Sequence, residues 1–162
     1  MPTIRNSIGT STANCYVSEA SANSYFDERY NSQAWDDLGG STNATAVSNL
    51  KAQILIQATR EIDNTFRFFG NKYNFGVRGQ SNYQNLEFPR STDYDASGVL
   101  YIEDEVKFAT YEQALWILQR TQPRRDEGEN IVNRSIIGKD TYNFLRMFVN
   151  RQIKPTGKHT WQ

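Results

Sequence analysis

This 162-residue sequence has little cysteine, little histidine and no net charge. It contains one cysteine, Cys15, and one histidine, His159, and its 18 basic residues balance 18 acidic ones. A single cysteine excludes a disulfide within the chain, and neither residue belongs to a recognisable catalytic triad or metal-ligand cluster. We therefore expect no catalytic residue, no metal and no cofactor. The absence of net positive charge also weakens a nucleic-acid role for the whole protein, because neutralising phosphates requires an excess of Lys and Arg.

Long apolar runs are absent as well. No stretch approaches the roughly 20 apolar residues of a membrane helix, and residues 1–17 lack the apolar core of a signal peptide. We expect a soluble product of a reducing cytoplasm with no membrane partner. With 38% hydrophobic and 22% charged residues, the composition is that of a chain that folds around one core.

Four segments have the apolar periodicity of helices. The first is predicted over residues 18–30 with Ser18 as N-cap, and the second, shorter one lies between Ser32 and Gly39. The third ends at Gly70 and has a stripe formed by Val47, Leu50, Ile54, Ala58, Ile62, Phe66 and Phe69. The fourth covers residues 102–120 and has a wide apolar face, which is typical of a central helix. The predicted fold class is mainly α, a small bundle of about four helices.

Residues 70–100 are dominated by glycine, asparagine, serine and tyrosine, and they predict a long loop with room for a short β-hairpin. Loops of this length are usually functional. Its aromatic and basic side chains could stack on nucleic-acid bases or contact another protein, and we favour protein contact because the chain has no net positive charge. The predicted contact or channel-facing residues are Phe68, Lys72, Tyr73, Phe75, Arg78 and Tyr83. Phe66 and Phe69 are assigned to the core by the preceding stripe.

The C-terminal part of the chain is both basic and apolar. We divide the sequence into a helical domain, residues 1–120, and a hinge with a docking tail, residues 121–162. The tail carries too many apolar groups to remain solvated, so it folds back on its own subunit or docks on a neighbouring one, and we favour the neighbour. A short helix is predicted over residues 141–149 with Asp140 as its cap. The predicted tail contacts are Ile131, Ile136, Ile137, Tyr142, Phe144, Leu145, Arg146, Phe148 and Arg151.

The order of several short motifs resembles a known family. The sequence has a Tyr-Phe pair at Tyr25 and Phe26, a following Trp35, the segment "LIQATR" at residues 55–60, "FPR" at residues 88–90 and an Ala- and Leu-rich helix at residues 106–118. This order resembles the head-to-tail connector, or adaptor, proteins of tailed bacteriophages, a family also labelled DnaT-like single-stranded-DNA-binding protein. Phe88 stands where a tryptophan is more usual. The resemblance covers residues 16–119.

The resemblance implies a structural role rather than a reaction. Such a protein is all-helical and stacks as a ring beneath the portal protein, at the neck of the virion, where it continues the DNA channel and attaches tail or further neck proteins. The ring is a homo-oligomer, commonly a dodecamer, assembled in the bacterial host cytoplasm, and DNA passes through it without sequence-specific binding. The alternative implied by the second label is a replication protein that binds single-stranded DNA.

Overall fold

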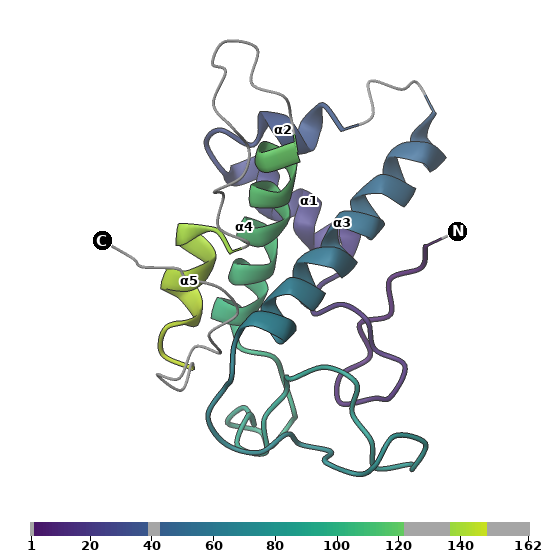
Figure 1. Cartoon of the computed structure of the whole chain (residues 1–162), viewed down its shortest axis with the longest axis vertical. Helices are drawn as coiled ribbons and strands as arrows, with labels where there is room; N and C mark the ends of the chain where they lie inside the picture. Colours follow the sequence, from purple (N-terminus) through teal and green to yellow (C-terminus); the bar gives the residue numbers. More distant parts are fainter. Residues whose placement is uncertain (1, 39–42, 122–136, 149–162) are drawn as a thin grey trace.

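Helices dominate the part of the chain that the structure describes. This computed structural model describes residues 2–38, 43–121 and 137–148 (Figure 1). Within these residues there are five helices, which are α1 (Glu19–Glu28), α2 (Gln33–Asp36), α3 (Ala44–Thr65), α4 (Asp104–Thr121) and α5 (Lys139–Leu145). The described residues contain no β-strand, so the predicted mainly helical bundle is confirmed. None of the described helices is both long and apolar enough to cross a membrane.

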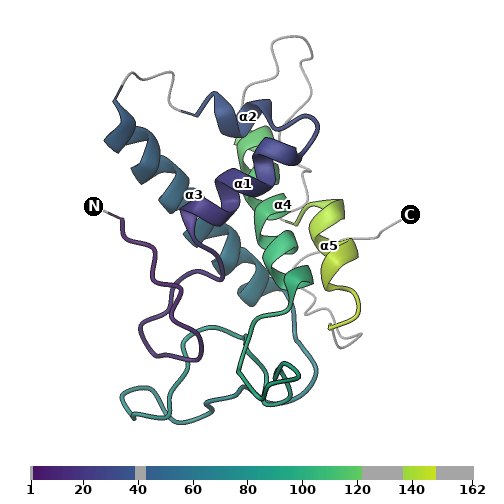
Figure 2. The same cartoon turned by 180° about the vertical axis from the view of Figure 1, so that it is seen from behind.

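α3 and α4 form the centre of the bundle, where they pack against each other. α1 packs on α3, whereas α2 and α5 both pack on α4 (Figure 1, Figure 2). The core holds Phe26 of α1, Trp35 of α2, Ile62 of α3 and Leu115 of α4, all almost completely buried. α4 is therefore covered by several helices, as its wide apolar face predicts.

Two helices, α1 and α3, begin directly after a residue whose side chain caps the first turn. Ser18 caps α1 as predicted, because its side-chain oxygen accepts a hydrogen bond from the Ser21 N–H and the Ser18 N–H donates one to the Ser21 hydroxyl oxygen. Asn43 caps α3, and its side-chain oxygen accepts hydrogen bonds from the Thr45 and Ala46 N–H groups. The predicted cap of the last helix is wrong, since Gly138 is the N-cap of α5 and Asp140 lies in its first turn.

The third helix ends earlier than its apolar stripe predicts. α3 stops at Thr65, and Phe66 already has an extended backbone. Phe69 is therefore not a core residue of this helix, and its side chain is 54% exposed. Toward its N-terminus α3 also diverges from α4 in both views, which leaves Leu50 exposed (Figure 1, Figure 2). The deeply buried positions instead lie in the second half of the helix, at Leu55, Ala58 and Ile62.

The long loop, residues 66–103, folds without strands. In place of a continuous hairpin it has isolated antiparallel bridges, which join Lys72 to Arg90, Phe75 to Tyr83, and Tyr94 to Leu100. The Phe88–Pro89 peptide bond is cis. The loop and the N-terminal segment lie together at one end of the bundle (Figure 1).

The described part of the tail, residues 137–148, packs on its own chain. Ile137 and Leu145 are buried in the core, and the rings of Phe144 and Phe148 pack against it. The segment covers the apolar face of α4 that α3 leaves open, which is why it folds back. Contact with a neighbouring subunit stays a prediction for its exposed residues Tyr142 and Arg146. Ile131, Ile136, Arg151 and most of the predicted hinge lie outside the described residues.

Candidate functional site

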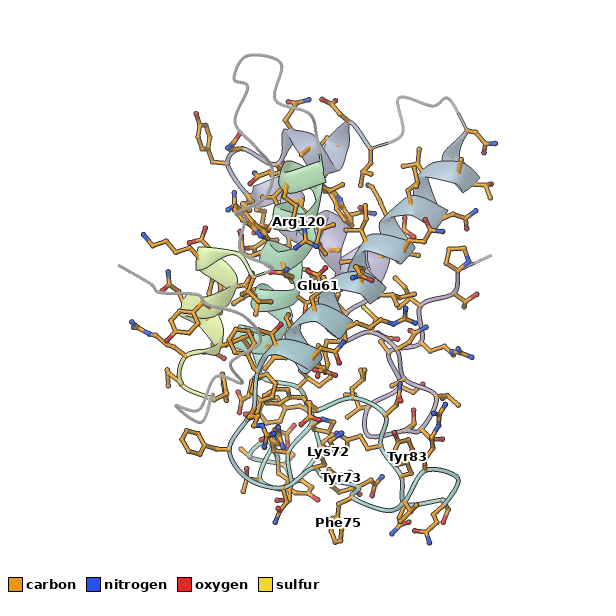
Figure 3. All side chains as sticks on the ribbon, in the orientation of Figure 1. Glu61, Lys72, Tyr73, Phe75, Tyr83 and Arg120 are labelled. Atoms are coloured by element: carbon orange, nitrogen blue, oxygen red, sulfur yellow. The ribbon has the colours of Figure 1, made fainter. Side chains whose placement is uncertain are left out.

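The exposed end of the long loop is the candidate functional site. Six apolar or aromatic side chains of the loop are exposed, and we call this set the loop surface: Phe69, Tyr73, Phe75, Val77, Tyr94 and Val99. Phe75 is 79% exposed, and Figure 3 shows it pointing away from the helices, with Tyr73 nearby. Tyr83, which is half-buried, pairs with Phe75 across a β-bridge.

The sequence predicts Phe68 as a contact residue and Phe69 as a core residue, and the structure shows the reverse. Phe68, predicted as a contact residue, is only 8% exposed, because its ring packs edge-on against Phe88 with 4.7 Å between centroids. The Arg90 guanidinium lies 5.4 Å from the centre of the Phe68 ring and covers it further. Phe69 points outward instead. Since the chain is extended after Thr65, consecutive side chains alternate between the core and the solvent.

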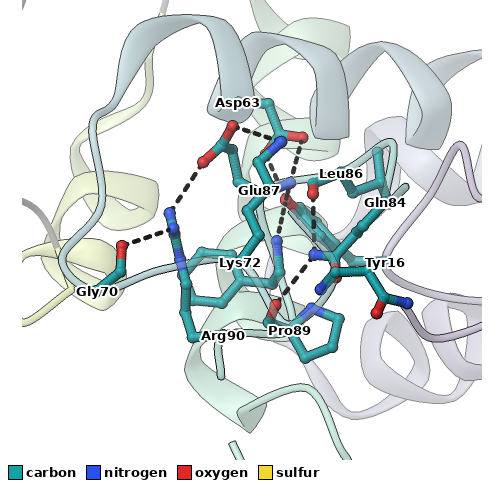
Figure 4. A network of polar contacts seen from close by, with 11 residues as sticks. Tyr16, Asp63, Gly70, Lys72, Gln84, Leu86, Glu87, Pro89 and Arg90 are labelled. Atoms are coloured by element: carbon teal, nitrogen blue, oxygen red, sulfur yellow. Dashed lines mark hydrogen bonds and ion pairs between the residues drawn. The ribbon is translucent and has the colours of Figure 1, made fainter. Parts of the chain in front are cut away.

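A polar network attaches the loop to the end of α3 (Figure 4). The Asp63 carboxylate accepts hydrogen bonds from the Tyr16 hydroxyl and, at 3.2 Å, from the Glu87 backbone N–H. The Glu87 carboxylate pairs with Lys72 and with Arg90, each at 2.9 Å. Burial raises the pKa of Asp63 to about 7 and raises the pKa of Tyr16 well above its ordinary value.

Gln84 holds the loop together from within. It is almost completely buried, and its side-chain N–H groups donate to the carbonyls of Leu86 and Pro89, both at 3.0 Å (Figure 4). Its carbonyl oxygen accepts a hydrogen bond from the Asn74 N–H at 3.3 Å. When a buried side-chain amide forms its hydrogen bonds, it holds the backbone around it in one arrangement. The loop is therefore positioned by its own polar side chains, although it has no strand.

The N-terminal segment supports the other side of the loop. Asn74 and Asn85 donate side-chain hydrogen bonds to the carbonyls of Gly9 and Ala13, both at 2.8 Å. Gly9 has φ +69°, and a Cβ placed there would lie 3.0 Å from the Tyr73 ring. The glycine thus permits both the left-handed backbone and the close approach of Tyr73.

The charges of the loop cancel. Residues 66–103 contain four basic side chains (Arg67, Lys72, Arg78 and Arg90) and four acidic ones (Glu87, Asp93, Asp95 and Glu103). Lys72 is neutralised by Glu87, and Arg90 is buried. Arg67 and Arg78 are exposed and form no ion pair with any residue that the structure describes. Of the predicted basic contact residues, Lys72 is therefore paired, and Arg78 is exposed in the turn between Phe75 and Tyr83.

By composition, sequence reasoning finds Tyr73 and Phe75 of the loop surface and the half-buried Tyr83, but it misses Phe69, Val77, Tyr94 and Val99. Val77, Tyr94 and Val99 show no periodicity that marks them as exposed. Their exposure follows from the turns around Gly79 and Gly98, which both have positive φ. Glycines typical of turns can be recognised in the sequence, and they are the signal from which the exposure of Val77, Tyr94 and Val99 could have been predicted.

Comparison with known proteins identifies the family. A family model described as putative DnaT-like ssDNA binding protein matches residues 3–146, which is most of the chain. The chain therefore belongs to this family, and one of the two labels implied by the motifs is confirmed. No curated protein and no solved structure matches the chain.

Proposed function

We propose that this member of the DnaT-like family is a structural head-to-tail adaptor of a tailed bacteriophage. It forms a ring of identical subunits, twelve by analogy with the adaptors it resembles, under the portal in the virion neck. The ring extends the DNA channel and offers the surface to which tail or further neck proteins attach. The ordered motifs between residues 16 and 119 support this role.

The observation that carries the proposal is the loop surface with its balanced charge. Six apolar or aromatic side chains are exposed on one loop, and the Tyr73 and Tyr94 rings lie 6.3 Å apart among them. Exposed apolar groups that gather in this way mark contacts with other proteins. Aromatic side chains with an occasional arginine are enriched at protein interfaces. Four positive and four negative charges leave no net field to attract a phosphate backbone.

Single-stranded DNA binding is the second candidate, and the family description points to it directly. The specific observation in its favour is that Phe75 and Tyr83 pair across a β-bridge and that Arg78 lies in the turn between them. Bases stack on exposed rings, at about 1 to 3 kcal/mol per base, and an arginine beside them can contact the backbone. This candidate predicts an affinity for DNA whose logarithm falls steeply with log salt.

A binding experiment with purified portal rings separates the two candidates. The variant Phe75→Ser/Val77→Ser removes the two most exposed apolar side chains of the loop surface. Under the adaptor proposal it lowers the affinity for portal rings or for tail proteins at least tenfold, measured by co-sedimentation. Tyr30→Ser is the matched control, because Tyr30 is 94% exposed and lies outside the loop.

Loss of single-stranded DNA binding in Phe75→Ser/Val77→Ser, with portal and tail binding unchanged, would establish the second candidate instead. Unchanged binding of every partner would remove the loop surface from the function altogether.

A further inference from the structure

A polar cleft with two arginines lies between the N-terminal segment and α3, apart from the loop surface. Its volume is about 570 Å³. From α3 it is lined by Gln53, Ile56, Gln57 and Arg60, whose spacing of three, four and seven residues places them on one face of the helix. From the N-terminal segment it is lined by Pro2, Thr3, Arg5 and Asn14.

Asn14 fixes the segment that carries Arg5. Its side-chain oxygen accepts a hydrogen bond from the Arg5 N–H at 2.7 Å, and its side-chain N–H donates to the Thr3 carbonyl at 2.9 Å. The Asn14 N–H in turn donates to the Arg5 carbonyl at 2.8 Å. The backbone of Arg5 is therefore held against Asn14 while its side chain stays exposed.

The lining of the cleft contains two guanidinium groups and no acidic side chain. Neither Arg5 nor Arg60 forms an ion pair with a residue in the described parts of the chain. The neighbouring carboxylate, Glu61, is buried, pairs with Arg120, and accepts hydrogen bonds from Gln113 and from the cleft-lining Gln57. In a chain with zero net charge, the lining of this cleft thus carries two positive side chains and no negative one.

We propose that this cleft binds a phosphate group. Guanidinium groups bind phosphate oxygens in a bidentate way, which favours arginine over lysine where phosphate is recognised. The Gln53 and Thr3 side chains can supply further hydrogen bonds, and the volume admits a phosphate together with its attached sugar. The phosphate belongs to a DNA strand or to a free nucleotide, and the experiment distinguishes these sources.

This inference does not rest on the adaptor proposal. If the chain contacts a nucleic-acid backbone, this inference places the contact at the cleft, whose lining has only positive charges. The loop is the less suitable place, because its positive and negative charges are equal in number. The variant Arg5→Gln/Arg60→Gln removes the two charges and keeps side chains of similar shape. The matched control, called the loop control because it contains Arg67 of the loop, is Arg67→Gln/Lys139→Gln, which removes two exposed basic side chains outside the cleft that form no ion pair with any described residue.

The experiment measures binding of fluorescent oligothymidylate, of a mononucleotide and of inorganic phosphate to the full chain in low salt. We expect the cleft variant to bind at least tenfold more weakly, and the loop control to stay within twofold of the unmodified chain. For the oligonucleotide, the slope of log affinity against log salt becomes shallower by roughly 0.7 to 1.4, for one or two phosphates. Arg5→Lys/Arg60→Lys retains charge without the bidentate geometry and has an intermediate affinity.

Binding of the nucleotide or phosphate alone, with the same loss in the cleft variant, supports the site and identifies a small phosphate compound as its ligand. The proposal is overturned if none of the three probes binds. It is also overturned if the loop control weakens binding as much as the cleft variant, since the attraction would then be general.

Discussion

At the scale of the residue, Asp63 controls the junction between α3 and the long loop. Its carboxylate accepts the Tyr16 hydroxyl and the Glu87 N–H, and it lies close to the ion pairs of Glu87 with Lys72 and Arg90. Burial raises the pKa of Asp63 to about 7 from an ordinary value of 3.8, although both hydrogen bonds favour the ionised form. Ionising Asp63 therefore costs stability in the folded chain.

The first prediction concerns the pH dependence of this cost. Between pH 3.8 and about 7 the folded chain holds a proton on Asp63 that the unfolded chain has lost, so the free energy of unfolding falls as pH rises through this range. The slope is at most about 1.4 kcal/mol per pH unit. Asp63→Asn removes this contribution, so urea unfolding at pH 5, 6, 7 and 8 gives a flatter curve for the variant.

Asp27→Asn, which changes an exposed carboxylate, is the control for this experiment. Parallel curves for Asp63→Asn and the unmodified chain would show that the Asp63 carboxyl is not held in its protonated form.

At the scale of single residues, the sequence predicts which side chains are buried correctly in the interior of the helices but poorly at the helix ends. The interior positions Phe26, Trp35 and Ile62 follow from periodicity alone and are buried. The burial of Phe68 and the exposure of Phe69 do not follow from periodicity, because the apolar stripe in the sequence continues after the helix has ended at Thr65. The end of α3 is set by the contacts of Phe66 and Phe68 with the distant Tyr142 and Phe88, which no local pattern contains.

At the scale of the element, Gln113 of α4 joins α5 to the bundle. Its side-chain oxygen accepts the Gly138 N–H and the Thr141 hydroxyl, both at 3.1 Å, and its amide N–H donates to Glu61 of α3 at 2.6 Å. One completely buried amide thus connects three helices. Nothing in the sequence distinguishes this glutamine from the others, since its partners are between 25 and 52 residues away.

The second prediction is that Gln113→Leu detaches α5. The variant leaves the Gly138 N–H and the Thr141 hydroxyl without their buried acceptor and removes one of the donors to Glu61, and we expect a loss of about 2 to 4 kcal/mol in the free energy of unfolding. Hydrogen exchange measured by mass spectrometry should show α5 amides exchanging faster than those of α3. Gln53→Leu, at an exposed position of α3, is the control. Unchanged protection of α5 in Gln113→Leu would contradict the role of this amide.

The third prediction tests the cap of α1. Ser18→Ala removes the side-chain oxygen that accepts the Ser21 N–H, and it should lower the free energy of unfolding by about 1 kcal/mol. Ser24→Ala is the matched control, because the Ser24 hydroxyl donates only to the Ala20 carbonyl within the same helix. Thermal unfolding that gives equal losses for both variants would show that Ser18 contributes no capping energy.

At the scale of the whole molecule, the fold consists of a helical bundle with one end occupied by irregular chain. The helices and their order are predictable, because their apolar periods are local. The arrangement of the long loop is not, because it depends on hydrogen bonds from Asn74 and Asn85 to the N-terminal segment and on the buried Gln84. The composition of the loop indicates a contact site, but only the folded chain shows that Lys72 and Arg90 are paired with Glu87.

The family and the geometry indicate different partners for this molecule. The family description names single-stranded DNA, whereas the loop surface has the apolar character of a protein contact. The two agree if protein contact belongs to the loop and phosphate contact belongs to the cleft of Arg5 and Arg60. The central claim remains structural, namely that the chain is a component of the virion neck.

Counting copies of the chain in purified virions tests this claim most directly. Quantitative mass spectrometry of virions from a phage that encodes the chain gives its ratio to the portal protein. The adaptor account predicts near-equal copies of the two. Absence of the chain from virions, with all of it left in the infected cell, would contradict the account and assign the protein to single-stranded DNA.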